Sequence, residues 1–396
     1  MRTVIIVLAC LLAGYSCQKA PRYVINGKIS GNAEGMKVVL NRVDYPQSEL
    51  IDSTVIKDGK FVFEGVVAEP GYYTIQIDRN PKGGEFSPRN VTNSPFYLEN
   101  SVISFSGNID SLPTMYWSDK PRKAAKVSGS AMEDLYKKFQ ADGRELRNRL
   151  GDLHGQYLEE YHRPALDGVF NKKKGIELAR AMEKLEKQLA DMKWEFVKNN
   201  IQTVVGFDMA KQYFQDMYVR ITPDQIDELE ALVEKAWPNT EKATEFKKMA
   251  EVGKRIAVGA KYPDIELVNP EGKKVKLSEY VPAGKYAMLE FWASWCGPCR
   301  GEIPHLREVY KEYKDKGFEI ISISIDRNDA DWKKAMKEEN MVWTQLNDPG
   351  EFDGPVAKVY NVQGVPTCIL LDKEGRIFKT DMRGAQLDAV LEEIYD

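Results

Sequence analysis

Residues 286–299 read YAMLEFWASWCGPC, and this stretch decides how the C-terminal part of the chain folds. Residues 286–293 are almost entirely apolar, which is typical of a buried strand. Cys296 and Cys299 follow, and the residues from Cys299 to Lys316 have the pattern of a helix. The sequence therefore predicts two thiols at the point where a buried strand passes into a helix.

Two thiols at this spacing can close a small disulfide ring with little rearrangement. A thiol at a helix start lies near unpaired N–H groups and the positive end of the helix dipole, which stabilise the thiolate and lower its pKa. Cys296 is therefore predicted to face solvent and act as the nucleophile. Cys299, one turn further into the helix and more buried, is predicted to be the resolving thiol.

Zinc sites use the same Cys-x-x-Cys spacing, but tetrahedral zinc needs two more nitrogen or sulfur ligands. The sequence has no second Cys-x-x-Cys and no His-x-x-x-His. We therefore expect no metal, and no cofactor other than the Cys296–Cys299 disulfide.

His305 is expected at the surface of the predicted helix. Cys368 begins the apolar run 368–371 and is expected to be a buried packing residue.

From residue 258 to residue 396, strand-like and helix-like segments alternate, which predicts an α/β sheet with helices on both faces. A turn at 374–375 makes the last two strands a hairpin. The expected strands are 286–293, 318–326, 342–346, 367–372 and 377–379, and the expected helices are 299–316, 329–340, 355–360 and 386–395.

Residues 290–299 (EFWASWCGPC) closely resemble the active-site segment of thioredoxins. Gly364-Val365-Pro366-Thr367 resembles the loop in which that fold places a cis-proline opposite the dithiol. Residues 262–265, 324–326 and 371–375 are similar to the exported TlpA/ResA-like branch of the redoxins. The resemblance covers about residues 258–396 and implies a thioredoxin-like domain that exchanges thiols and disulfides.

The resemblance also implies roles for other residues. Glu290 stands where thioredoxins carry a buried aspartate, so burial should raise its pKa and let it exchange a proton with Cys299. A carboxylate with a purely structural role is the alternative. Trp295 is expected either to contact substrate or to be an aromatic residue at the rim of the site without a role in binding. The residues expected to bind substrate are Trp295, Gly297, Pro298, Val365, Pro366 and Thr367.

The N-terminus has the features of an export signal. Arg2 precedes an apolar run at 4–13, which has the length of a signal core and is shorter than the roughly 20 residues of a membrane span. Residues 1–16 are therefore predicted to be a signal peptide. The segment resembles a bacterial lipoprotein signal, which implies acylation of Cys17 and a tether at 17–22; ordinary secretion and a retained anchor are the alternatives. We expect a periplasmic, membrane-tethered protein.

Residues 23–117 contain short runs of β-branched and aromatic residues separated by Gly, Pro, Asn and Asp, which predicts an all-β sandwich. Asp58-Gly59 predicts a hairpin between two of these runs. Residues 118–257 are predicted to be a helical linker or bundle, because apolar residues step by 4 and 3 from Leu178 to Phe196. This apolar seam is expected either to be part of the core within the domain or to form an interface between copies of the chain. The chain is thus predicted to be multidomain, with a β-sandwich, a helical spacer and a thioredoxin-like α/β domain.

Composition excludes several classes of protein. The 56 Lys and Arg against 60 Asp and Glu give a net charge of −4, so no basic excess favours nucleic acid as a partner. Five cysteines, unevenly spread, are too few for a disulfide scaffold.

The expected function is a periplasmic thiol-disulfide oxidoreductase that reduces or isomerises protein disulfides. Gly297-Pro298 is the pair found in strongly reducing thioredoxins, and a periplasmic reductase requires a membrane thiol electron donor. Proteins of this kind often serve cytochrome c maturation or the repair of oxidised proteins, and no residue selects between them.

One alternative is a thiol peroxidase, although its Pro-x-x-x-Thr-x-x-Cys loop does not precede Cys296. The other is a non-catalytic binding or assembly protein that works through the β domain and the seam.

Overall fold

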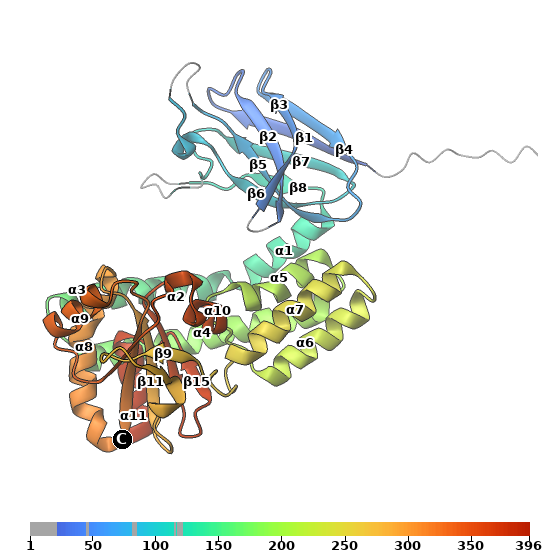
Figure 1. Ribbon diagram of the computed structural model, residues 1–396. Coiled ribbons are helices and arrows are strands. Elements are labelled where there is room, and N and C mark those ends of the chain that lie inside the picture. The colour runs from blue at the N-terminus through green and yellow to red at the C-terminus, as the bar shows by residue number, and fades with distance from the viewer. Residues whose placement is uncertain (1–21, 45–46, 81–84, 115, 117–121) are drawn as a thin grey trace, which may run out of the picture. The chain divides into compact units, whose positions relative to one another are not determined.

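The computed structural model describes residues 22–44, 47–80, 85–114, 116 and 122–396 (Figure 1). The predicted signal peptide and Cys17 lie outside the described residues, so both stay predictions. The chain divides into two compact units, residues 1–137 and 138–396. In the part of the chain that is described, no helix is long and apolar enough to cross a membrane.

The first unit is the predicted β-sandwich, built from two four-stranded sheets with strand orders β4-β1-β7-β8 and β3-β2-β5-β6. Successive side chains of a strand point to opposite faces, so Ile25 of one sheet and Val38 of the other both reach a shared core. The strands are β1 (Tyr23–Ser30), β2 (Lys37–Asp44), β3 (Gln47–Val55), β4 (Lys60–Gly65), β5 (Gly71–Ile77), β6 (Ser94–Leu98), β7 (Val102–Asn108) and β8 (Lys126–Ser128).

The predicted turn at Asp58-Gly59 is confirmed. Lys57 and Lys60 exchange backbone hydrogen bonds of 2.9 Å, and Asp58 and Gly59 adopt φ angles of 50° and 67°. Positive φ at both central residues is what a two-residue hairpin turn of type I′ requires. Strand β8 pairs antiparallel with β7 and lies beyond residue 117, where the sequence pattern ended the β domain.

The second unit begins with helices, as the sequence predicts for this region. Thr222 caps α6 through a reciprocal hydrogen-bond pair with Gln225, and Pro223 is the first helical residue. Along the predicted seam, Leu178, Met182 and Leu185 are buried within the chain. The helices are α1 (Ala131–Asp142, which starts in the first unit), α2 (Arg144–Tyr157), the π-helix η2 (Leu158–His162), α3 (Arg163–Leu166), α4 (Lys172–Asn200), α5 (Val204–Gln215), α6 (Pro223–Ala236) and α7 (Glu241–Ile256).

A seven-stranded sheet of order β10-β9-β13-β12-β11-β14-β15 follows and confirms the predicted thioredoxin-like α/β fold. Strand β11 lies between β12, to which it is parallel, and β14, to which it is antiparallel. The strands are β9 (Glu266–Val268), β10 (Lys274–Lys276), β11 (Tyr286–Trp292), β12 (Phe318–Ser324), β13 (Thr344–Asn347), β14 (Thr367–Leu371) and β15 (Ile377–Thr380), and the helices are α8 (Gly297–Tyr313), α9 (Asp329–Glu338), α10 (Pro355–Tyr360) and α11 (Gly384–Tyr395).

The helical segment and the α/β domain share a buried cluster, although the sequence pattern suggested separate parts. Tyr161 and Ile176 pack with Ala385 and Ala389 of α11 in one buried cluster. The hydroxyl of Tyr157 accepts a hydrogen bond of 3.3 Å from the Ala385 N–H, at the start of α11. Helices of the predicted spacer therefore cap and cover part of the α/β domain.

The expectation that His305 lies at the surface is wrong, because this side chain is buried between α8 and α11. Its Nε2 lies 3.0 Å from Oδ2 of Asp388, and its Nδ1 lies 3.3 Å from Oε1 of Glu302. Burial by itself lowers the pKa of His305, but the two carboxylates outweigh burial and raise this pKa to about 9. The charged ring therefore ties α8 to α11 through Asp388, a partner that the local sequence does not reveal.

Candidate active site

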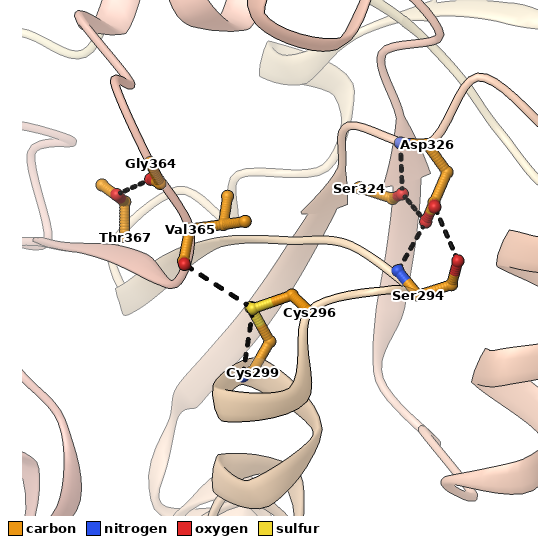
Figure 2. The surroundings of a disulfide bond; sticks show 8 residues. All are labelled: Ser294, Cys296, Cys299, Ser324, Asp326, Gly364, Val365 and Thr367. Atoms are coloured by element: carbon orange, nitrogen blue, oxygen red, sulfur yellow. Dashed lines mark hydrogen bonds between the residues drawn. A yellow bond between two sulfur atoms is a disulfide. The ribbon is translucent and has the colours of Figure 1, made fainter. Parts of the chain in front are cut away.

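The dithiol lies where strand β11 ends and helix α8 begins, as predicted. Cys296 is the N-cap residue of α8, and the Cys299 N–H donates a hydrogen bond of 3.2 Å to the Cys296 sulfur (Figure 2). An N–H group at a helix N-terminus stabilises negative charge on a nearby atom. The first turn of α8 is therefore arranged to hold a thiolate at Cys296.

Cys296 and Cys299 are joined in a disulfide with their Cα atoms 5.3 Å apart. In this state Cys296 is 5% exposed and Cys299 is fully buried. Cys296 thus shows less surface than the sequence suggested, because the ring holds its sulfur against the protein. It is still the sulfur of the pair that a reagent from solvent reaches.

The Gly364–Thr367 loop faces the dithiol, and the Val365–Pro366 bond is cis, as the resemblance implied. The carbonyl oxygen of Val365 lies 3.6 Å from the Cys296 sulfur (Figure 2). Val365 and Pro366 are half-buried and keep surface beside the dithiol. Thr367 was expected to contact substrate, but it is 1% exposed and its hydroxyl donates to the Gly364 carbonyl at 2.7 Å, so it shapes the loop instead.

Around the dithiol, Trp295, Gly297 and Pro298 are exposed, with 57% of the Trp295 surface free. The Trp295 ring lies 6.4 Å from that of Phe352, which is itself 44% exposed. Sequence reasoning missed Phe352, because it comes from a separate short helix, η5 (Glu351–Asp353). The two rings form an apolar rim at the site.

Asp326 anchors the turn that leads into Cys296, and sequence reasoning gave it no such role. Its carboxylate accepts hydrogen bonds of 2.8 Å from the Ser294 N–H and 2.6 Å from the Ser294 hydroxyl (Figure 2). The Ser324 hydroxyl donates a third at 2.7 Å. Hydrogen bonds to a charged acceptor are strong, so this carboxylate fixes the backbone just before the dithiol. The only signal in the sequence was the position of Asp326 after an apolar strand.

Glu290 is 1% exposed and lies in β11 between Ser322 of β12 and Cys368 of β14. Its Oε2 has no hydrogen-bond partner among the described residues. Burial raises the pKa of Glu290 to about 8, a hydrogen bond with Ser322 lowers this pKa in part, and the charge of Glu302 raises it. Near neutral pH the carboxyl therefore holds its proton.

Cys368 is a buried free thiol, as expected for a packing residue. Burial raises its pKa well above the ordinary value, and the nearby Glu290 adds to the rise. A neutral thiol is a poor nucleophile. Among the described residues, no group of three or more His, Cys, Asp or Glu side chains is placed to hold a metal ion.

Comparison with known proteins identifies the domain that carries this geometry. The AhpC/TSA family matches residues 258–380. The thiol-disulfide oxidoreductase ResA of Bacillus thuringiensis subsp. konkukian is 34% identical over 139 residues, which make up 35% of this chain and 77% of that protein.

The chain belongs to the ResA family of thiol-disulfide oxidoreductases. ResA of Geobacillus kaustophilus is 33% identical over 122 residues, 31% of this chain and 67% of that protein. A crystal structure of the thioredoxin domain of a thiol-disulfide oxidoreductase from Bacteroides vulgatus is 35% identical and covers 35% of this chain and 99% of that domain, with a TM-score of 0.33. In this ResA-family oxidoreductase, residues 23–136 match a domain of unknown function, DUF4369.

The raised pKa of Glu290 gives a testable pH dependence of stability. A carboxyl with a raised pKa binds more protons in the folded state than in the unfolded state between about pH 4.5 and pH 8. The free energy of unfolding of the oxidised protein should therefore fall with rising pH in this window, relative to Glu290→Gln, by at most about 1.4 kcal/mol per pH unit. Urea unfolding from pH 5 to pH 9 measures the difference between the two proteins.

Glu308→Gln, at an exposed position of α8, is the matched control and should follow the wild type at every pH. His305 titrates in all three proteins, so its contribution cancels in the difference. A difference between wild type and Glu290→Gln that stays constant from pH 5 to pH 8 would contradict the raised pKa.

Proposed function

We propose that this protein is a periplasmic thiol-disulfide oxidoreductase that reduces or isomerises protein disulfides through Cys296 and Cys299. The observation that carries the proposal is the dithiol at the N-terminus of α8, facing the Val365 carbonyl at 3.6 Å. Membership of a thiol-disulfide oxidoreductase family supports the reaction type.

The reaction begins with the reduced enzyme. The Cys296 thiolate attacks one sulfur of a substrate disulfide, and the other substrate sulfur leaves as a thiolate and takes up a proton. Cys299 then loses its proton and attacks the Cys296 sulfur, which releases the second substrate thiolate. The substrate gains two electrons and two protons, and the enzyme is left with the Cys296–Cys299 disulfide described above.

Glu290 is proposed to carry the proton of Cys299. In the disulfide form its pKa of about 8 leaves the carboxyl protonated at neutral pH. It can give this proton to Cys299 when a donor reduces the disulfide, and it can take the proton back when Cys299 attacks. Burial without a strong partner is what keeps the pKa in this useful range.

Substrate is proposed to lie across the exposed surface of Trp295, Gly297 and Pro298 and along the backbone of Val365 and Pro366. A polypeptide that pairs with the Val365 backbone gains main-chain hydrogen bonds, as in strand addition to a sheet edge. The apolar rim formed by Trp295 and Phe352 suits the apolar side chains of an extended segment.

The resolving cysteine can be tested by trapping. Cys299→Ser keeps the nucleophile but cannot resolve the mixed disulfide, so it should accumulate a covalent adduct with a protein disulfide such as that of insulin. Non-reducing gel electrophoresis and mass measurement detect the adduct, which dithiothreitol should release. Cys296→Ser is the control and should form none, since the two thiols that it leaves in this domain, Cys299 and Cys368, are both buried. Equal adduct formation by both variants would assign the nucleophile elsewhere.

The direction of electron flow follows from the reduction potential. The Gly297-Pro298 pair favours reduction, so we expect the Cys296–Cys299 couple to have a potential near about −270 mV, as in thioredoxin. Equilibration with a dithiol of known potential, followed by thiol counting, measures it. A value near about −120 mV, as in strong periplasmic oxidants, would reverse the proposed direction.

The proposed periplasmic location rests on the N-terminal sequence, in which Cys17 follows the predicted signal peptide. We propose that acylation of Cys17 tethers the protein to a membrane and that a membrane thiol protein supplies its electrons. In the native host, Cys17→Ala should abolish incorporation of labelled palmitate, whereas Cys10→Ala, inside the predicted signal, should retain it. Labelling that survives in Cys17→Ala would remove the lipid tether from the proposal.

A further inference from the structure

Residues 216–220, part of the segment that joins α5 to α6, lie along the end of the Gly364–Thr367 loop. At one end, the Asn361 side-chain amide donates a hydrogen bond of 3.4 Å to the Asp216 carbonyl. At the other end, Arg220 forms an ion pair of 3.3 Å with Asp381, just beyond β15. The loop that connects α5 to α6 in the predicted spacer therefore packs on the part of the domain that faces the dithiol.

Tyr218 contacts the backbone immediately after the loop. Its hydroxyl accepts a hydrogen bond of 3.2 Å from the Cys368 N–H. The hydroxyl is largely buried, and burial raises its pKa, so it stays protonated and neutral. A buried N–H that loses its acceptor costs free energy, so Tyr218 holds the first residues of β14 in place.

Met217 contacts the loop just after the cis peptide bond, at Thr367. Its sulfur lies 3.0 Å from the Thr367 hydroxyl oxygen, and that hydroxyl donates to the Gly364 carbonyl. A Cβ placed on Gly364 would meet Cε of Met217 at 3.6 Å, an ordinary van der Waals contact. Thr367, which follows Pro366, is thus held from the helical segment, and the Met217 side chain ends near Gly364, which precedes Val365.

These contacts bear on the reaction because the loop carries the Val365 carbonyl, 3.6 Å from the Cys296 sulfur. A substrate strand that pairs with Val365 must bring its disulfide into line with that sulfur. Small displacements of reacting groups cost large factors in rate. A protein substrate therefore depends on the position of the loop, whereas a small disulfide that makes no backbone pairing does not.

We propose that Tyr218 and Met217 are positioning residues, which hold the Gly364–Thr367 loop and the start of β14 so that a protein disulfide aligns with Cys296. The inference rests on the proposed function. It assigns to the helical segment a part in substrate use, because residues 150 positions away in the sequence from the loop set the loop's position.

The test compares two substrates, insulin and hydroxyethyl disulfide, with dithiothreitol as the electron source. Tyr218→Phe removes only the accepting oxygen, and we expect kcat/KM for insulin to fall about 5- to 10-fold, the usual size for one neutral hydrogen bond. The rate with hydroxyethyl disulfide should stay within about twofold of the wild type. Tyr213→Phe is the matched control, because the Tyr213 hydroxyl, also buried, has no hydrogen-bond partner among the described residues. It should leave both rates unchanged.

Met217→Ala, which removes the contact with Thr367, should likewise lower kcat/KM for insulin alone, and Met217→Leu, which keeps most of the volume, should recover most of it. An equal loss on both substrates would mean that the two residues only stabilise the fold and would overturn the proposal, as would no loss on either. Failure of the wild-type protein to reduce either substrate would instead refute the proposed function.

Discussion

The structure depends on one local arrangement, a sulfur atom held at the positive end of a helix that starts where a central strand stops. The Cys299 N–H points at the Cys296 sulfur, and this needs β11 to end and α8 to begin within a few residues. The neighbouring strands then supply the rest of the site. Strand β12 leads to Asp326, which holds the turn before the dithiol, and β14 is preceded by the loop that faces it. The sheet order therefore brings three separate parts of the chain to one sulfur pair.

Two carboxyls in this domain, the buried Glu290 and the half-buried Glu302, show how desolvation can accompany opposite protonation states. Glu290 has one oxygen without a hydrogen-bond partner among the described residues, so burial raises its pKa to about 8. For Glu302 burial acts in the same direction, but the charged ring of His305 and the Gly384 N–H outweigh it and hold the pKa below its ordinary value. Glu290 is thus able to exchange a proton near neutral pH, while Glu302 stays charged and joins α8 to α11.

The helical segment is more closely joined to the redox domain than a spacer needs to be. Tyr157 accepts a hydrogen bond from the first turn of α11, and Lys172 of α4 forms an ion pair of 2.7 Å with Glu312 of α8. A long helix packed in this way removes apolar surface of α11 from water, which stabilises both parts together. The segment around Tyr218 extends the same packing to the loop that faces the dithiol. The AhpC/TSA match begins at residue 258, so these contacts join the matched domain to helices that precede it.

The sequence by itself determined the features that depend on neighbouring residues. The apolar run of β11, the Cys-x-x-Cys pair and the hairpin turn at Asp58-Gly59 all follow from local pattern, because strand burial and turn geometry are set within a few residues. The tertiary structure alone decided the burial of His305 against Asp388, the anchoring of Ser294 by Asp326 and the contact of Tyr218 with Cys368. Each of these contacts joins residues between 32 and 150 positions apart. Its energy depends on how the elements pack, so no periodic pattern in the sequence predicts it.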